Sequence, residues 1–197
     1  MNMSFQSLIT GPKALGLRVI RCVTRPLVSC LATALGLGLA LPVAAQGTGP
    51  TLDRIKAAYV YNFAKFVELP GAEEMPIRLC VVGKDDPNDR MFSLNRRIAQ
   101  KREILVRKDV AMDQLKDCGM VFVGAADNRL LPQVVKQLGN APVLVISDDR
   151  QAIDQGAHLG LLHNDDRVEF EVNLLNLQRS NLRASSQMLK LARTVVR

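Results

Sequence analysis

The sequence has 197 residues, of which 26 are basic and 19 acidic, and 48% of its residues are hydrophobic. The formal net charge of +7 is uneven, because the first 45 residues carry four basic side chains and no acidic one. Without that segment the counts become 22 basic and 19 acidic, so the remainder lacks the strongly basic balance of a nucleic-acid-binding domain. The length suffices for one domain with its own hydrophobic core.

The first 45 residues have the three regions of a secretory signal peptide. Basic residues come first, an apolar run covers residues 27–41, and Val43 and Ala45 are the small residues that a signal peptidase requires. The apolar run is shorter than the ~20 residues that span a bilayer. We therefore expect export from the cytoplasm, cleavage near Ala45-Gln46, and a single domain over residues 46–197. An uncleaved amphipathic anchor is the alternative.

Four cysteines divide between these two parts of the chain. Cys22 and Cys30 lie in the signal segment. A lipid on Cys30 is a further alternative to cleavage, but the apolar run follows this cysteine, whereas it should precede a lipid-attachment site. Cys80 and Cys118 remain, an even number in an oxidising compartment. We expect these two cysteines to form a disulfide, with two buried thiols as the alternative.

The first half of the domain is predicted to alternate between helix and strand. Apolar and aromatic residues recur at helical spacing over residues 55–66, with Thr51 as the expected N-cap and Pro70-Gly71 as the end of the helix. A strand is expected over residues 77–83. The Asp-Pro pair that follows it predicts a helix over residues 86–98.

Further strands are expected over residues 104–107, 120–124 and 143–146, with a helical turn at 112–115 and a helix at 128–138 between them. The apolar runs are continuous, which is typical of strands buried on both faces of a parallel sheet. The predicted fold class is therefore α/β, a three-layer (Rossmann-like) sandwich with a mostly parallel sheet.

The pattern changes near the C-terminus. Residues 157–162 and 167–172 flank a turn, and apolar and charged residues alternate in the second segment. This alternation predicts a half-exposed antiparallel hairpin at one side of the sheet. A last helix is expected over residues 188–196.

Motifs of known chemistry are missing from the sequence. The first strand ends in one glycine, Gly83, so neither a dinucleotide fingerprint nor a phosphate loop is present. No Gly-x-Ser-x-Gly nucleophile motif occurs, and the remaining cysteines are not spaced as Cys-x-x-Cys. His163 with Asp165 and Asp166 has potential metal ligands, but such a group is more often a solvated turn. We expect no catalytic residue, metal or cofactor.

Basic residues are dense after residue 95, where six fall within thirteen positions. A solvated face is one interpretation, and a docking patch for an acidic partner is the other. The residues that we expect to contact a partner are Arg96, Arg97, Lys101, Arg102 and, near the last helix, Arg183.

Five segments, in this order, resemble the YfiR family of periplasmic proteins. The first is the helix Ile55 to Pro70, with the sequence IKAAYVYNFAKFVELP. The others are residues 79–83 (LCVVG), 118–123 (CGMVFV), 145–148 (VISD), and 168–193, which runs from VEFEVN through LRASS to LKLAR. The likeness extends over nearly the whole exported domain.

The resemblance implies a periplasmic regulator and not an enzyme. Such a protein binds the periplasmic domain of an inner-membrane diguanylate cyclase and inhibits it, which lowers cyclic-di-GMP signalling and biofilm formation. An outer-membrane lipoprotein that sequesters the regulator is a further implied partner, and a homodimer remains open. The alternative is a small-ligand sensor or binding protein of the same fold, with a pocket near Asp85, Asp148 and Arg183.

Overall fold

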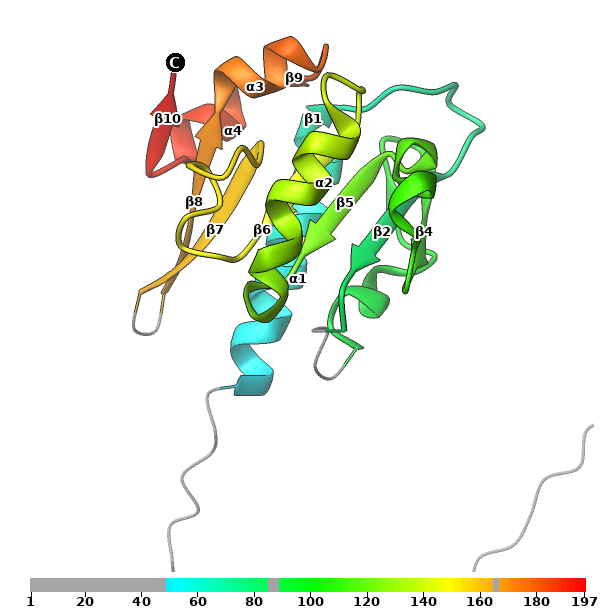
Figure 1. Ribbon diagram of the computed structural model, residues 1–197. Coiled ribbons are helices and arrows are strands. Elements are labelled where there is room, and N and C mark those ends of the chain that lie inside the picture. Colours follow the sequence, from blue (N-terminus) through cyan, green and yellow to red (C-terminus); the bar gives the residue numbers. More distant parts are fainter. Residues whose placement is uncertain (1–48, 85–88, 165–166) are drawn as a thin grey trace, which may run out of the picture. The chain divides into compact units, whose positions relative to one another are not determined.

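The computed structural model describes residues 49–84, 89–164 and 167–197 (Figure 1). The signal segment, Asp85, the Asp86-Pro87 pair, Asp165 and Asp166 lie outside the described residues. Within the described ranges, no helix combines the length and apolar character that crossing a membrane requires.

The centre of the fold is an eight-stranded sheet with the order β10-β8-β7-β6-β5-β2-β4-β3. Neighbouring strands are parallel except in the pairs β7-β8 and β3-β4. The sheet is therefore mostly parallel with an antiparallel hairpin near the C-terminus, which confirms the predicted class. Its strands are β2 (Ile77–Val82), β3 (Ile98–Ala99), β4 (Arg102–Arg107), β5 (Met120–Val123), β6 (Leu144–Ser147), β7 (Leu159–Asn164), β8 (Arg167–Asn173) and β10 (Thr194–Val196).

Helices cover both faces of the central strands. Figure 1 shows α2 (Leu131–Leu138) in front of the sheet and α1 (Gly49–Phe66) behind it. Leu79 and Val81 of β2 belong to the core under α1, whereas Cys80 and Val82 belong to the core under α2. Successive residues of a strand point to opposite faces, so a strand buried on both faces must be apolar throughout.

The helix α1 packs its aromatic stripe against the hairpin. The ring centroids of Phe63 and Phe170 are 5.3 Å apart, and those of Tyr59 and Phe170 are 5.8 Å apart. The Tyr59 hydroxyl donates a hydrogen bond of 2.7 Å to the Val168 carbonyl. On the other face of β8, Glu169 and Glu171 are partly exposed. The half-exposed hairpin is thus confirmed.

The prediction of a helix over residues 86–98 is wrong. The described part of that segment contains the 3₁₀ turn η2 (Met91–Leu94), followed by strand β3. Met91 and Leu94 are both buried and three residues apart, which suits a single 3₁₀ turn. Arg96 then has a φ of 66°, a left-handed conformation that a helix cannot continue through.

The last helix also differs from the expectation. It is α4 (Ser186–Leu191), and the residues after it form β10, parallel to β8. Thr194, Val195 and Val196 are β-branched, which favours a strand. The sequence did not predict α3 (Leu174–Arg179), nor the two-stranded pair β1 (Val67–Glu68) and β9 (Arg183–Ala184).

Shorter elements complete the fold. The expected helical turn is η3 (Met112–Asp117), and the turn η4 (Ala125–Leu130) leads into α2. The helix α1 begins at Gly49, before the expected cap Thr51, and ends at Phe66, before the expected stop. The strand β1 follows directly and takes up two of the three residues before Pro70.

Candidate functional site

The cysteines of the domain are joined by a disulfide. The Cys80 and Cys118 sulfurs are 1.99 Å apart, and their Cα atoms 6.1 Å apart. Cys80 lies in β2, and Cys118 follows η3, directly before β5. Both side chains are buried in the core under α2.

A buried ionic cluster fills the carboxyl end of β6. The Asp148 carboxylate accepts hydrogen bonds from Lys56 Nζ at 2.6 Å, from Arg90 Nη1 at 3.4 Å and from the Ala125 N–H at 2.7 Å. Arg90 also pairs with Asp53 of α1 at 3.1 Å. The carboxyl ends of parallel strands are where α/β proteins often bind ligands, but here the protein's own charges meet. The cluster fastens the N-terminal half of α1 to the sheet.

The residues of the alternative ligand pocket do not come together. Asp148 contacts Lys56 in the middle of α1, whereas Arg183 is aligned with Glu68 just after its end. The helix rises about 15 Å between Lys56 and Phe66. Asp148 and Arg183 therefore lie at different levels along α1, and Asp85 is outside the described residues.

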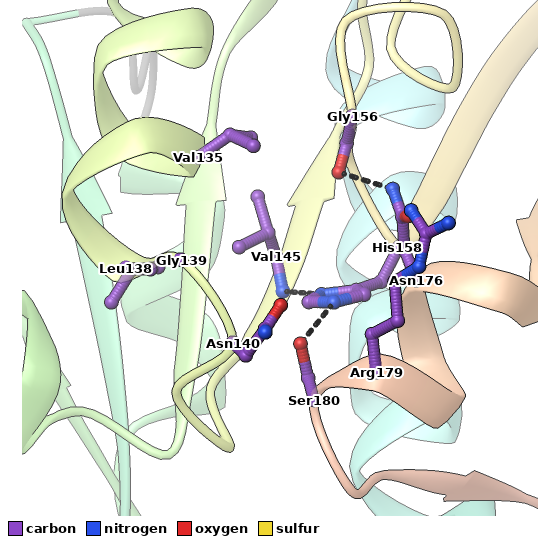
Figure 2. Close-up of a pocket in the computed structure, with 10 residues that line it drawn as sticks. All are labelled: Val135, Leu138, Gly139, Asn140, Val145, Gly156, His158, Asn176, Arg179 and Ser180. Carbon is purple, nitrogen blue, oxygen red and sulfur yellow. Dashed lines mark hydrogen bonds between the residues drawn. The ribbon is translucent and has the colours of Figure 1, made fainter.

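A cavity of about 230 Å³ contains the buried histidine (Figure 2). His158 Nδ1 accepts a hydrogen bond of 2.9 Å from the Val145 N–H, and Nε2 lies 3.0 Å from Ser180 Oγ. Burial lowers the pKa of His158 to about 4, against a smaller opposite effect of a hydrogen bond with the Asn176 backbone. The imidazole is therefore neutral at pH 7.

The His158–Ser180 pair is not arranged as a general base and a nucleophile. Because Nδ1 accepts a hydrogen bond from the Val145 N–H, the neutral ring carries its proton on Nε2 and donates a hydrogen bond from there to Ser180 Oγ. In this tautomer the nitrogen that faces the serine, Nε2, has no lone pair with which to take the serine proton. The pair instead connects the approach to β7 with the end of α3.

A surface with aromatic, aliphatic and cationic side chains lies where α1 meets β3. We call it the α1–β3 surface. The Arg97 guanidinium lies over the Tyr61 ring at 4.4 Å, and Lys65 Nζ is 5.7 Å from the Tyr61 and Phe66 ring centroids. Ile98 is 55% exposed. The surface comprises Tyr61, Lys65, Phe66, Arg97 and Ile98.

Side-chain hydrogen bonds to the backbone fix this surface. The Tyr61 hydroxyl donates to the Ile98 carbonyl at 2.8 Å. Gln100 Nε2 donates to the carbonyls of Ala64 and Val67 at 2.8 and 2.7 Å, which satisfies acceptors at the C-terminus of α1. The cations Lys65 and Arg97 lie close to the negative end of the helix dipole.

The structure divides the predicted basic patch. Arg97 belongs to the α1–β3 surface, and the exposed Arg183 lies in β9, next to the end of α1. Arg96 and Lys101 are both 79% exposed and face Glu103 and Glu73, respectively, across 3.8 and 3.5 Å.

Arg102 is a correction to that patch, because its side chain is only 7% exposed. Its Nε donates to the Met75 carbonyl at 2.7 Å and its Nη1 to the Leu69 carbonyl at 3.2 Å. Burial lowers the pKa of this guanidinium. A buried arginine of this kind does not belong to a docking surface. The sequence reasoning also missed Tyr61 and Lys65, whose i, i+4 spacing was the available signal.

His163 is exposed, and its two candidate metal-ligand neighbours lie outside the described residues. Within residues 49–84, 89–164 and 167–197, no three His, Cys, Asp or Glu side chains gather as a metal site would require.

The fold and its contacts define a disulfide-linked α/β domain with an aromatic and cationic surface. Residues 53–193 match the family model described as YfiR/HmsC-like, and the chain belongs to that family. The family is one of periplasmic regulators of diguanylate cyclase signalling.

A solved structure shares the fold at low sequence identity. A conserved domain protein from Vibrio cholerae O1 biovar El Tor str. N16961 matches with a TM-score of 0.50 and 8% identity. The match covers 71% of this chain and 59% of that one. The ABC domain in complex with L-Trp from Streptococcus pneumonia matches with a TM-score of 0.45 and 10% identity, over 61% and 55% of the two chains.

Proposed function

We propose that this protein binds the periplasmic domain of an inner-membrane diguanylate cyclase and holds the enzyme in its inactive state, so that cyclic-di-GMP falls. Membership of the YfiR/HmsC-like family supports the partner class. In this proposal residues 1–45 are a signal peptide removed during export, and residues 46–197 form the working domain.

The α1–β3 surface is the observation that carries the proposal. Tyrosine and arginine are the residue types most enriched among the binding hot spots of protein interfaces. Here Arg97 is stacked on Tyr61, and the Tyr61 hydroxyl is hydrogen-bonded to the backbone, so binding would cost little side-chain entropy at the tyrosine. Arg183 flanks the same end of α1. The partner surface that fits is apolar with an acidic rim.

Inhibition by binding requires a preference between two states of the cyclase. A regulator shifts such an equilibrium only by the difference between its affinities for the inactive and active forms. Near-complete inhibition requires a preference of about 10⁴-fold. The aromatic contacts would supply most of the affinity, and the cations would speed encounter.

A binding measurement with matched variants tests this surface. We expect Tyr61→Ala and Arg97→Glu to weaken binding to the purified periplasmic domain of the cyclase by tenfold or more, about 1.4 kcal/mol. Lys136→Glu makes the same charge change at an exposed position of α2, on the other face of the sheet, and should bind normally. Equal affinities of Arg97→Glu and Lys136→Glu would remove the surface from the proposal.

An outer-membrane lipoprotein that sequesters the regulator is the further partner that we propose, and it should compete with the cyclase. Light scattering of the free protein shows whether it is a homodimer that has to dissociate before it binds either partner.

The cavity beside His158 favours a second candidate function, a small-ligand sensor. Its polar lining includes Asn140, Asn176 and Arg179. A ligand that raises the thermal midpoint of the wild-type protein, but not of Arg179→Gln, would support this candidate. If no ligand does so while the cyclase binds, the regulator proposal stands without a sensor role.

A further inference from the structure

We propose that a second cavity, at the amino ends of β2, β4 and β5, binds a small molecule through a phosphate or carboxylate oxyanion. The cavity has a volume of about 200 Å³. We call it the Arg102 cavity, and the residues of its lining that matter here are Gly71, Arg78, Arg102, Lys116 and Asp117. The inference does not depend on the proposed partner.

Arg102 is the central observation, because it is a buried cation without a counter-charge. More than nine-tenths of the residue is buried, and its hydrogen bonds go to two neutral carbonyls, those of Met75 and Leu69. Among the described residues, no carboxylate oxygen lies within 4 Å of its nitrogens. Nη2 has no hydrogen-bond acceptor in the protein and is not fully enclosed, so it is accessible from the cavity. Burying a charge is costly unless the charge is paired.

Two further cations line the same cavity. Arg78 donates its Nε to the Asp117 carbonyl, which fixes the guanidinium and leaves its terminal nitrogens for other acceptors. Lys116 comes from the end of η3. The one carboxylate in the lining is that of Asp117, which is exposed. Three cations against one carboxylate give the cavity a net positive charge.

Another acidic side chain close to Arg102 is already engaged. Glu73 lines a neighbouring cavity together with Arg102, but it pairs with Lys101 at 3.5 Å and is itself mostly exposed. It therefore does not neutralise the buried guanidinium.

Gly71 lets the loop after β1 approach Arg102 closely. A Cβ atom at this position would lie 2.8 Å from Arg102 Nη2, so a side chain here would displace the guanidinium. The φ of +108° at Gly71 also favours glycine. Glycine at this position therefore helps to keep the guanidinium where it lies in the cavity lining.

The arrangement fits an oxyanion better than a chloride ion. A guanidinium presents its N–H donors in a planar fork that matches the paired oxygens of carboxylate and phosphate groups. The volume is several times the ~30 Å³ share of one water molecule, which leaves room for an organic group beside the anion. A bound oxyanion would connect β4 through Arg102, β2 through Arg78, and η3 through Lys116.

Isothermal titration calorimetry on the exported, oxidised protein tests the site. The probes are inorganic phosphate, glycerol phosphate and citrate, each titrated to about 10 mM against potassium chloride of equal ionic strength. We expect at least one probe to bind, with a tenfold loss of affinity in Arg78→Gln and a several-fold loss in Lys116→Gln. Lys136→Gln, on α2, should bind as the wild type does. The tightest probe distinguishes a phosphate ester from a carboxylate or free phosphate.

Substitution of Arg102 itself could unfold the protein, so it is not the deciding variant. The proposal is overturned if none of the three probes binds more strongly than chloride. It is also overturned if Arg78→Gln and Lys116→Gln keep the wild-type affinity while circular dichroism shows both to be folded.

Discussion

Removing the negative charge of Asp148 should destabilise the protein more than removing its cationic partner Lys56. The side chain of Asp148 is 2% exposed, and those of Lys56 and Arg90 are 12% and 4% exposed. Asp148→Asn keeps an oxygen for the Ala125 N–H but removes the negative charge that both Lys56 and Arg90 contact. Breaking a buried pair from one side costs about 3–5 kcal/mol. Since Asp53 still pairs with Arg90, we expect about 3 kcal/mol.

Lys56→Met should cost less, about 1–2 kcal/mol, because Asp148 keeps Arg90 and a backbone donor and the methionine retains the apolar stem. The double variant should recover part of the loss, because no uncompensated charge from this pair remains. Asp154→Asn removes an exposed carboxylate and should stay within about 0.5 kcal/mol of wild type.

Urea unfolding of the oxidised protein at pH 7 measures these differences. The loss of about 3 kcal/mol corresponds to a fall in Tm of about 6–12 °C for a domain of this size. The reasoning is refuted if Asp148→Asn is within 1 kcal/mol of wild type, or if Lys56→Met is the more destabilised of the two.

Three further predictions concern stability. His158 has a folded-state pKa of about 4, below its unfolded value of about 6.5, so the unfolded state binds the proton first and stability falls as the pH drops between those values. From pH 7.5 to 5.0 the free energy of unfolding should fall by about 2 kcal/mol. This fall should be absent in His158→Gln and present in His163→Gln. The same pH dependence of stability in both variants would contradict the prediction. Reducing the disulfide, which closes a loop with a sequence separation of 38, should lower the free energy of unfolding by about 4 kcal/mol. Equal urea midpoints with and without reductant would contradict this prediction. Phe63→Ala should cost about 3–5 kcal/mol because Phe63 is 1% exposed, whereas Phe92→Ala, at 48% exposed, should cost far less; equal losses would contradict this packing.

The central sheet could be predicted from the sequence because its strands are buried on both faces. Continuous apolar runs such as residues 120–123 are compatible with few other structures when glycine or polar residues bound them. The hairpin could also be predicted, because apolar and charged residues alternate along β8. The prediction of a helix after residue 86 was wrong because the Asp-Pro pair indicates only where a helix could begin. It does not indicate the left-handed φ of Arg96, which a helix cannot include. The strand β10 was not predicted because it forms by pairing with the edge of β8, which is distant in the sequence.

The candidate surface was only partly predictable, because it is assembled by contacts between distant segments. Arg97 and Tyr61 stack across 36 sequence positions, and neither residue's own neighbours indicate this. Arg102 looked like another member of an exposed basic run. Its burial follows from its place at the start of β4, where the loop after β1 folds over it and offers two carbonyls. The separation of Asp148 from Arg183 likewise depends on the direction of α1.

The level of cyclic-di-GMP in a strain that lacks this protein tests the regulator proposal most directly. With the cognate cyclase expressed, deletion should raise cyclic-di-GMP, and complementation with wild type or Lys136→Glu should restore the low level. Arg97→Glu should restore it only in part, although the variant folds and is exported. An unchanged cyclic-di-GMP level in the deletion strain, with the cyclase present and active, would contradict the account.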